Sequence, residues 1–294
     1  METQVIKANA KINICLKVKG KRTDGFHNLD MVMASLELCD ILYVEEINDG
    51  SIIVDMSEEI CDAKNNICYR LIEKVKTVYN IEKGIKLYIQ KNIPSGAGLG
   101  GGSADAAALL KCLNKIWNLD MNVQNMIDFS KDLGSDIPFC IIEGIARVEG
   151  KGEKITPLET ELNKDVLLFV PSKKLNTKKV FEEHKTIDNH KSLVKDVIKS
   201  IKLNEKDIYN FNDLQPAADR LTKNVVKNII DNCKNEGLSN CFMTGSGSTV
   251  VALLDRKDNI SEKSERMKLL FPEITIFRTS LKMYTYWKRK NVNV

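Results

Sequence analysis

The sequence has no CxxC pair, no apolar run approaching the roughly 18 residues of a membrane span, and no long stretch of one charge sign. Its eight cysteines are scattered, several of them inside apolar runs, so we expect reduced core residues rather than disulfides or metal ligands. The 44 basic and 40 acidic residues are interspersed, which argues against a nucleic-acid duplex or an anionic membrane as partner. The N-terminus lacks the apolar segment of a signal peptide, so we expect a cytoplasmic protein.

The composition is that of an ordinary folded protein. Apolar residues make up 43% and charged residues 29% of the 294 positions, enough for a sizeable core. At roughly 150 residues per domain, this length predicts two domains. We place the boundary near residue 152, beside a stretch punctuated by glycine, which gives an N-terminal domain of residues 1–152 and a C-terminal domain of residues 153–294.

The first half of the chain shows mainly strand periodicity. Alternating apolar residues predict strands at 12–18, 41–46, 52–56 and 85–89. Helices are predicted from residue 67, capped by Asn66, over residues 104–117, and from about residue 123 to a C-cap at Gly134.

The second half mixes strands and helices without the strict alternation of a doubly wound sheet, which favours an α+β domain. Strands are predicted at 166–170, 241–244, 250–254 and 274–278. Helices are predicted from residue 177, over 193–201, over 216–233, and between the last two strands.

The most informative segment is PSGAGLGGGSADAAA, which contains five glycines between a predicted strand and a predicted helix. Glycine lets backbone amides approach a bulky anion, and the following helix adds unpaired N–H groups and the positive end of its dipole. A triphosphate such as that of ATP is the natural guest. A flexible hinge or simple tight turn is the alternative, which the flanking strand and helix disfavour.

This loop differs from two common phosphate-binding motifs. No GKS or GKT closes the run, so the lysine of a Walker motif is missing. The GAGLGG portion matches GxGxxG of the dinucleotide-binding folds, but the acidic residue expected about 20 residues later is not evident.

The segment resembles the second motif of the GHMP kinases, roughly PxxxGLGSSAA. Its GGGSADAA form is similar to the branch that phosphorylates a cytidine-diphosphate methylerythritol in the non-mevalonate route to isoprenoid precursors. Three further blocks agree with this branch: KANAKINICLKVKGKRTDGFHNLDMV, LGSDIPF and TGSGSTV. The resemblance implies a two-domain α+β GHMP kinase fold, with a β-rich N-terminal ATP-binding domain and an α/β-plait C-terminal domain.

The resemblance also implies the reaction, which is transfer of a phosphoryl group from ATP, with Mg²⁺, to the 2-hydroxyl of the methylerythritol moiety. Asp136 would accept the proton of that hydroxyl, and Lys11 would keep the carboxylate ionised and balance the developing charge. On local sequence alone, Asp136 fits a turn or helix-cap aspartate equally well, and Lys11 a solvated strand residue.

The family pattern distributes ligand contacts over both halves of the chain. His27 would pair with the edge of the cytosine, and Phe26, where the family often has tyrosine, would stack on its face. Asn13 would bind the acceptor, and Phe181 would be a second stacking ring unless it is a core residue. The expected ATP contacts are Pro94, Ser95, Gly96, Ala97, Gly98, Leu99, Gly100, Gly101, Gly102, Ser103, Ala104 and Asn66. Ser103 is also the candidate Mg²⁺ ligand.

Two alternatives stay open at this point. Another GHMP kinase, acting on homoserine, mevalonate or a sugar, would share the glycine loop, and Phe26 with His27 disfavours it. A non-catalytic nucleotide-binding or RNA-binding protein also fits the loop and the net charge of +4.

A second glycine turn is predicted at residues 245–247. It is either a turn that closes on the active site or a plain β-turn. His184 is expected at the surface. The oligomeric state is left open.

Overall fold

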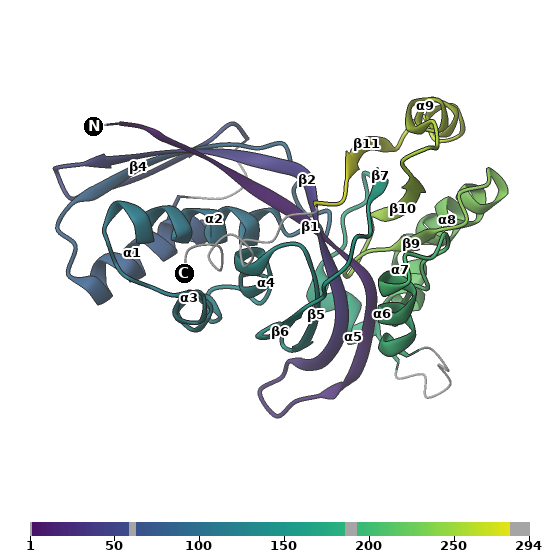
Figure 1. The fold of residues 1–294 in the computed structure, drawn as a ribbon, viewed down its shortest axis with the longest axis horizontal. Helices are drawn as coiled ribbons and strands as arrows, with labels where there is room; N and C mark the ends of the chain where they lie inside the picture. Colours follow the sequence, from purple (N-terminus) through teal and green to yellow (C-terminus); the bar gives the residue numbers. More distant parts are fainter. Residues whose placement is uncertain (1, 59–62, 186–192, 283–294) are drawn as a thin grey trace. The chain divides into compact units, whose positions relative to one another are not determined.

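The computed structural model describes residues 2–58, 63–185 and 193–282 (Figure 1). The chain divides into two compact units, each built from separate stretches. The first unit comprises Met1–Lys11, Leu38–Ser95 and Gly100–Ile142, and the second comprises Ile12–Glu37, Gly96–Leu99 and Glu143–Val294. Two long strands and the glycine-rich segment therefore pass from one unit to the other, while the domain boundary near residue 152 stays a prediction.

Strands and helices alternate irregularly along the chain, as the mixed order in the sequence suggests. The strands of the first half are β1 (Gln4–Lys21), β2 (His27–Ile47), β3 (Ile52–Met56), β4 (Gly84–Gln90) and β5 (Ile145–Gly150). The helices of the first half are η1 (Ala63–Asn65), α1 (Ile67–Tyr79), α2 (Gly101–Ile116), α3 (Val123–Ser130) and α4 (Ile137–Ile142). The later strands are β6 (Lys154–Pro157), β7 (Lys164–Val170), β8 (Phe211–Asn212), β9 (Cys241–Met243), β10 (Val250–Asp255) and β11 (Thr275–Ser280). The later helices are α5 (Thr177–Glu183), α6 (Val194–Lys202), α7 (Gln215–Thr222), α8 (Val225–Asn235) and α9 (Ile260–Leu270).

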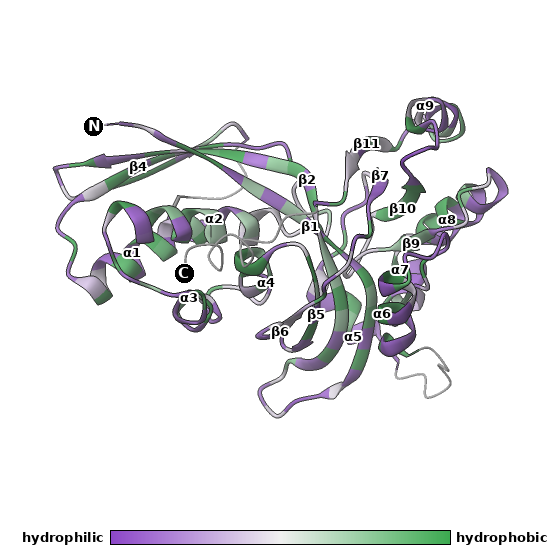
Figure 2. Cartoon of the chain, in the orientation of Figure 1, coloured by the Kyte–Doolittle hydropathy of each residue, from purple (hydrophilic) through white to green (hydrophobic). Residues whose placement is uncertain are grey.

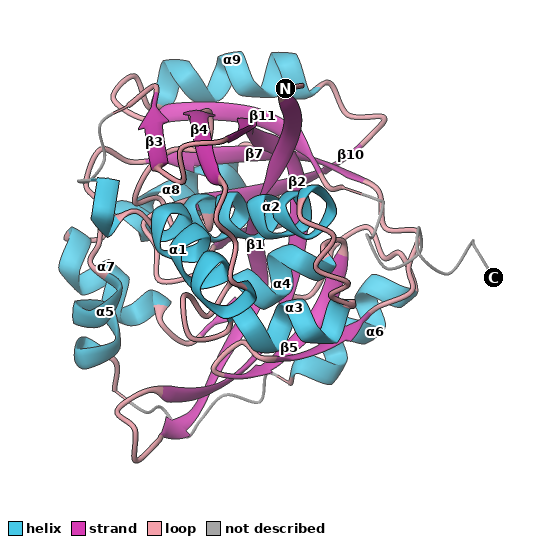
Figure 3. Cartoon of the chain, turned by 90° about the vertical axis from the view of Figure 1, so that its left-hand side faces the viewer, coloured by secondary structure: helices cyan, strands magenta, loops and turns pink. Residues whose placement is uncertain are grey.

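The first unit combines a twisted sheet with helices. Strand β4 pairs antiparallel with β2 and parallel with β3, and β1 lies next to β2 in the strand order. Along β4, Ile85, Leu87 and Ile89 are buried while Lys86 and Tyr88 are exposed, the period of two that the sequence predicts. Helix α1 packs against β3 and α2, and α2 packs against α4, with α1 and α2 side by side in Figures 1 and 3.

Helix α1 begins and ends at asparagines. The side chain of Asn66 accepts a hydrogen bond from the backbone N–H of Cys68 at 2.8 Å, which confirms the predicted N-cap. Asn80 ends the helix in the left-handed conformation at φ 53°. The buried face of α1 consists of Cys68, Leu71, Ile72 and Val75. Colouring by hydropathy shows the resulting apolar and polar sides (Figure 2).

Two predicted helix ends in the first unit are wrong by a few residues. Helix α2 begins at Gly101 rather than at residue 104, because Gly100, at φ 72°, already turns the chain into the helix. Helix α3 ends at Ser130, with Lys131 as its C-cap, so Gly134 is not the C-cap. The hydroxyl of Ser130 instead donates to the carbonyl of Met126 inside the helix.

The second unit contains a four-stranded antiparallel sheet in the order β11-β7-β10-β9. Its central strands are buried, as the apolar runs at 166–170 and 250–254 predict. The same unit holds the antiparallel pairing of β2 with β5 and of β5 with β6, and the parallel pairing of β1 with β8. This combination confirms the α+β class.

The predicted helix at 216–233 is two helices. Helix α7 ends at Thr222 and α8 begins at Val225, because Lys223 and Asn224 are both left-handed, at φ 55° and 65°. Two consecutive left-handed residues cannot continue a right-handed helix. Apolar periodicity runs through the break, so it did not mark the interruption.

Six of the described cysteines are buried, as expected of core residues, and Cys39 is partly exposed. No disulfide joins the described cysteines to one another; they are Cys15, Cys39, Cys68, Cys112, Cys140, Cys233 and Cys241. Cys61 lies outside the described residues. None of the described helices combines the length and the apolar character needed to cross a bilayer.

Replacing Asn66 tests the cap of α1. We expect Asn66→Ala to lower the free energy of unfolding by about 1 kcal/mol, because the N–H of Cys68 loses its partner. Asn66→Ser retains a side-chain oxygen that can cap the helix, so its free energy of unfolding should fall much less. Urea denaturation of the three proteins measures this, and equal stability of the alanine and wild-type proteins would show that the cap contributes nothing.

Candidate active site

The glycine-rich segment alternates between buried side chains and glycines with positive φ. Ala97 and Leu99 are 4% and 1% exposed, and they anchor the loop in the protein. Gly98 and Gly100, at φ 75° and 72°, adopt a backbone conformation that residues other than glycine rarely take. The anchoring residues leave the intervening backbone free to present its amides to an anion, and helix α2 follows directly.

Gly100 is in close contact with Lys11 of β1. A Cβ atom at Gly100 would lie 2.8 Å from Cγ and 2.9 Å from Cε of Lys11. The alkyl stem of Lys11 therefore lies directly on the backbone of the loop, and any side chain at position 100 would have to displace it. Glycine is required at position 100 both by its φ and by this contact.

The ammonium group of Lys11 pairs with Asp136. Nζ lies 3.2 Å from Oδ2 of Asp136, with the lysine side chain 6% and the aspartate side chain 32% exposed. A buried cation thus lies beside a carboxylate that is open to solvent on one side. The sequence predicts this pair across 125 positions from the family pattern alone, and the structure brings the two residues together.

Asp136 immediately precedes α4. Its backbone carbonyl accepts a hydrogen bond from the N–H of Cys140 at 3.1 Å, which starts the helical pattern. The backbone is therefore part of the helix start, as the alternative interpretation of GSDIP suggests, while the carboxylate pairs with Lys11. All residues of helix α4, which follows Asp136, are buried.

The second glycine turn lies against the first glycine loop, within the second unit. A Cβ atom at Gly98 would lie 3.3 Å from the carbonyl oxygen of Gly247 and 3.5 Å from that of Thr244. Ser246 shares a hydrogen bond of 2.9 Å with Thr177, and Ser248 donates to the carbonyl of Lys173 at 2.7 Å. Residues 245–248 thus form a tied turn that supports the apex of the loop.

Asn212, which the sequence did not mark, and Thr244, the first residue of the TGSGSTV block, hold this turn. The side chain of Asn212 donates to the carbonyl oxygens of Met243 and Gly245, at 3.0 and 2.8 Å. The hydroxyl of Thr244 accepts from the backbone N–H of Asn13 at 2.8 Å. These contacts arise where β8 pairs with β1, and no local pattern marks such a pairing.

Asn13 is buried, at 3% exposure, and its side-chain amide donates to the sulfur of Met31 at 3.2 Å. It lies two positions after Lys11 on β1, so both side chains point to the same side of the strand. The structure therefore places Asn13 in a packed environment in which its orientation is fixed.

His27 and Phe181 stack on each other within the second unit. Their ring centroids are 4.9 Å apart and their planes differ by 21°. Burial lowers the pKa of His27, and the positive charges of His184 and Lys21 lower it further. His184, expected only as a surface residue, is half-buried and acts on His27 electrostatically.

Phe26, at the tip of the β1–β2 hairpin, is 58% exposed. Nζ of Lys151 lies 5.0 Å from the centroid of its ring, and Lys151 also pairs with Asp24 at 3.6 Å. Asp24 in turn accepts from the backbone N–H of Phe26 at 3.2 Å. One face of the exposed ring is therefore covered by a cation.

The remaining predicted ATP contacts belong to the first unit. Pro94 and Ser95 precede its apex, Gly101, Gly102, Ser103 and Ala104 form the first turn of α2, and Asn66 caps α1. The buried hydroxyl of Ser95 has no hydrogen-bond partner among the described residues. Hydroxyl and amide groups near an anion-binding helix start are typical phosphate ligands.

Comparison with family models identifies this arrangement. The model for the GHMP kinases N terminal domain matches residues 66–144, and the model for the GHMP kinases C terminal region matches residues 190–273. The chain belongs to the GHMP kinase family, and it is an ATP-dependent kinase of the two-domain fold typical of that family.

The chain is also similar to individual proteins of known name. A 4-diphosphocytidyl-2-C-methyl-D-erythritol kinase of Caldicellulosiruptor saccharolyticus is 34% identical over 94% of this chain and 96% of the relative. One from Clostridium botulinum is 37% identical over 93% and 99%. A crystal structure of a 4-(cytidine 5'-diphospho)-2C-methyl-D-erythritol kinase has a TM-score of 0.81 at 26% identity, covering 96% of this chain and 100% of that one. A homoserine kinase from Cytophaga hutchinsonii, with a TM-score of 0.75 at 15% identity, shares the fold.

Gly100→Ala tests the contact between the loop and Lys11. We expect a loss of kcat of about 100-fold, because the new methyl group must displace the stem of Lys11 and the backbone must leave its positive φ. Gly237→Ala is the matched control, since Gly237 also has a positive φ of 75° but nothing lies within 4 Å of its Cβ position. Equal kcat values for the two variants would contradict the contact as the cause.

Titration of His27 by NMR tests the electrostatics of the ring pair. We expect a pKa below the usual value of about 6.5. His184→Gln should raise it, because removing a neighbouring positive charge makes protonation of His27 easier. A pKa of His27 that stays the same or falls in the variant would show that His184 does not act on it.

Proposed function

We propose that this kinase transfers the γ-phosphoryl group of ATP to the 2-hydroxyl of 4-diphosphocytidyl-2-C-methyl-D-erythritol, a step in the non-mevalonate route to isoprenoid precursors. The observation that carries the transfer chemistry is the ion pair of Lys11 with Asp136, whose lysine stem lies on Gly100 of the glycine-rich loop. The choice of acceptor is supported by relatives of that name at 33–37% identity over about 93% of the chain. The aromatic pair of His27 and Phe181 supports it further.

In the proposed reaction, Asp136 accepts the proton of the 2-hydroxyl. The oxygen then forms a bond to the γ-phosphorus while the bond from that phosphorus to the bridging oxygen breaks, and ADP leaves with the negative charge. The ammonium of Lys11 balances the negative charge on Asp136 and on the transferred group. The backbone amides of the glycine-rich loop and the start of α2 hold the phosphates of ATP.

Magnesium would be held mainly by ATP. Among the described residues, no group of three or more His, Cys, Asp and Glu side chains is arranged to hold a metal ion. Mg²⁺ bound to a nucleotide needs only one or two protein ligands, since phosphates and water complete its octahedron. The hydroxyl of Ser103, in the first turn of α2, fits that small donor set, and the bound ion would neutralise charge on the phosphates.

The cytidine portion would bind through aromatic and amide groups of the second unit. A neutral His27, favoured by its lowered pKa, both donates and accepts hydrogen bonds, as pairing with a cytosine edge requires. Phe181 and the free face of Phe26 offer flat apolar surfaces for the base. Asn13, oriented by its packing, would bind the acceptor.

A cytoplasmic location is proposed because six buried cysteines form no disulfide with one another among the described residues, as is usual for proteins of a reducing compartment.

A panel of acceptors tests the proposed function. ADP release should be fast with 4-diphosphocytidyl-2-C-methyl-D-erythritol and negligible with homoserine or mevalonate, since neither carries a base for the aromatic residues. Asp136→Asn should bind ATP normally and lose about 10²- to 10⁴-fold in kcat, because amide nitrogen and oxygen cannot serve as the base. Turnover of homoserine or mevalonate instead of the cytidine compound would contradict the acceptor, and full activity of Asp136→Asn would contradict the mechanism.

A further inference from the structure

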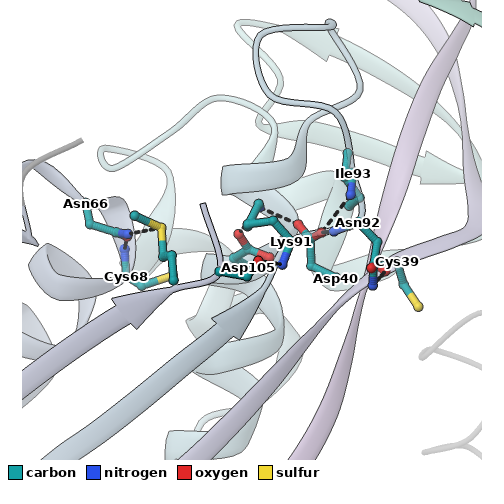
Figure 4. A network of polar contacts seen from close by, with 10 residues as sticks. Cys39, Asp40, Asn66, Cys68, Lys91, Asn92, Ile93 and Asp105 are labelled. Carbon is teal, nitrogen blue, oxygen red and sulfur yellow. Dashed lines mark hydrogen bonds and ion pairs between the residues drawn. The ribbon is translucent and has the colours of Figure 1, made fainter. Parts of the chain in front are cut away.

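A buried cluster of one lysine and two aspartates lies in the first unit, where the glycine-rich loop leaves and re-enters it (Figure 4). Asp40 belongs to β2, Lys91 follows β4, and Asp105 belongs to α2. Their side chains are 0%, 5% and 4% exposed. Nothing in the proposed reaction uses these charges.

The lysine joins the two carboxylates. Nζ of Lys91 pairs with Oδ2 of Asp40 and donates to Oδ2 of Asp105 at 2.7 Å. The other oxygen of Asp40 accepts from the backbone N–H groups of Asn92 and Ile93, at 2.6 and 2.8 Å. Asp40 therefore fixes the two residues directly before Pro94, where the loop begins.

The far end of the loop is held by the same lysine. Asp105 lies in the second turn of α2, which starts at Gly101 as the loop ends. A Cβ atom at Gly101 would lie 3.3 Å from Cγ2 of Ile93 and 3.5 Å from Nζ of Lys91, so the first residue of the helix also packs against the cluster. One cation thus connects the start of the loop to its end.

The two aspartates of the cluster differ in their hydrogen bonds. Both oxygens of Asp40 have donors, whereas Oδ1 of Asp105 has no hydrogen-bond partner among the described residues. Burial raises the pKa of Asp105 to about 7, Lys91 opposes the shift, and Asp40 adds to it. Apolar residues of similar volume often give equal or greater stability than such a buried ion cluster. Stability alone therefore does not account for three charges at this position.

We propose that Asp40, Lys91 and Asp105 form a clamp that fixes the two ends of the glycine-rich loop relative to each other and so positions its amides for the phosphates of ATP. The three are positioning residues that do not touch the nucleotide. The inference rests on the proposed role of the loop in ATP binding and is independent of the acceptor.

The clamp is tested by ATP affinity, measured by calorimetric titration in the absence of any acceptor. Asp105→Ala, which releases α2 from Lys91, should weaken ATP binding about 10- to 100-fold. Asp105→Asn keeps an oxygen that accepts from Lys91, so its affinity should stay within about threefold of the wild type. In turnover assays the KM for the acceptor should not change, since that site lies elsewhere in the chain.

Asp255→Ala is the matched control. It removes the carboxylate partner of Lys164, another buried lysine, 3% exposed, in the sheet of the second unit. Nζ of Lys164 lies 2.5 Å from Oδ1 of Asp255 and also donates to the backbone carbonyls of Glu205 and Lys206. We expect it to lower the thermal unfolding temperature and leave ATP affinity unchanged.

Wild-type affinity in Asp105→Ala, or an equal loss of affinity in Asp255→Ala, would overturn the clamp. If Asp105→Ala does not fold, Asp105→Ser is judged by the same two outcomes. Because the titration contains no acceptor, failure of the proposed acceptor would leave its result intact, and the two failures are distinguishable.

Discussion

The stem of Lys11 packs on the bare backbone of Gly100 while its ammonium reaches Asp136, and this contact sets the geometry of the proposed catalytic pair. It requires a glycine in a left-handed conformation at one end of the loop, a buried lysine on β1, and a carboxylate at the start of α4. Phosphoryl transfer depends mainly on positioning and on charge balance, which are what these three elements supply. In the proposed mechanism, Lys11 of β1 supplies a cation and the loop itself contains no Walker lysine.

The apex and the two ends of the glycine-rich loop are each held by contacts of their own. The apex lies on the tied turn at residues 245–248, and the ends are held in the first unit by Lys91 and its two aspartates. A loop that binds an anion through its amides loses affinity if those amides must be ordered at each binding event. The supports therefore offset the flexibility that five glycines would otherwise introduce.

Much of this was predictable from the sequence because it is encoded locally or by family pattern. The strand at 85–89 and the cap at Asn66 follow from periodicity and residue type, and the pairing of Lys11 with Asp136 follows from the GHMP resemblance. The split between α7 and α8 was missed because apolar periodicity continues across two left-handed residues. Asp40 and Asn212 were missed because their partners are set by strand pairing, which brings together residues far apart in the chain.

A double-mutant cycle on kcat for Lys11→Met and Asp136→Asn tests most directly whether the ion pair acts as one catalytic unit. If it does, kcat of the double variant should fall by about the same factor as kcat of the more impaired single variant. The effects of substituting residues that act together are strongly non-additive. Losses that multiply in the double variant would mean that the two residues act independently, and would contradict the account.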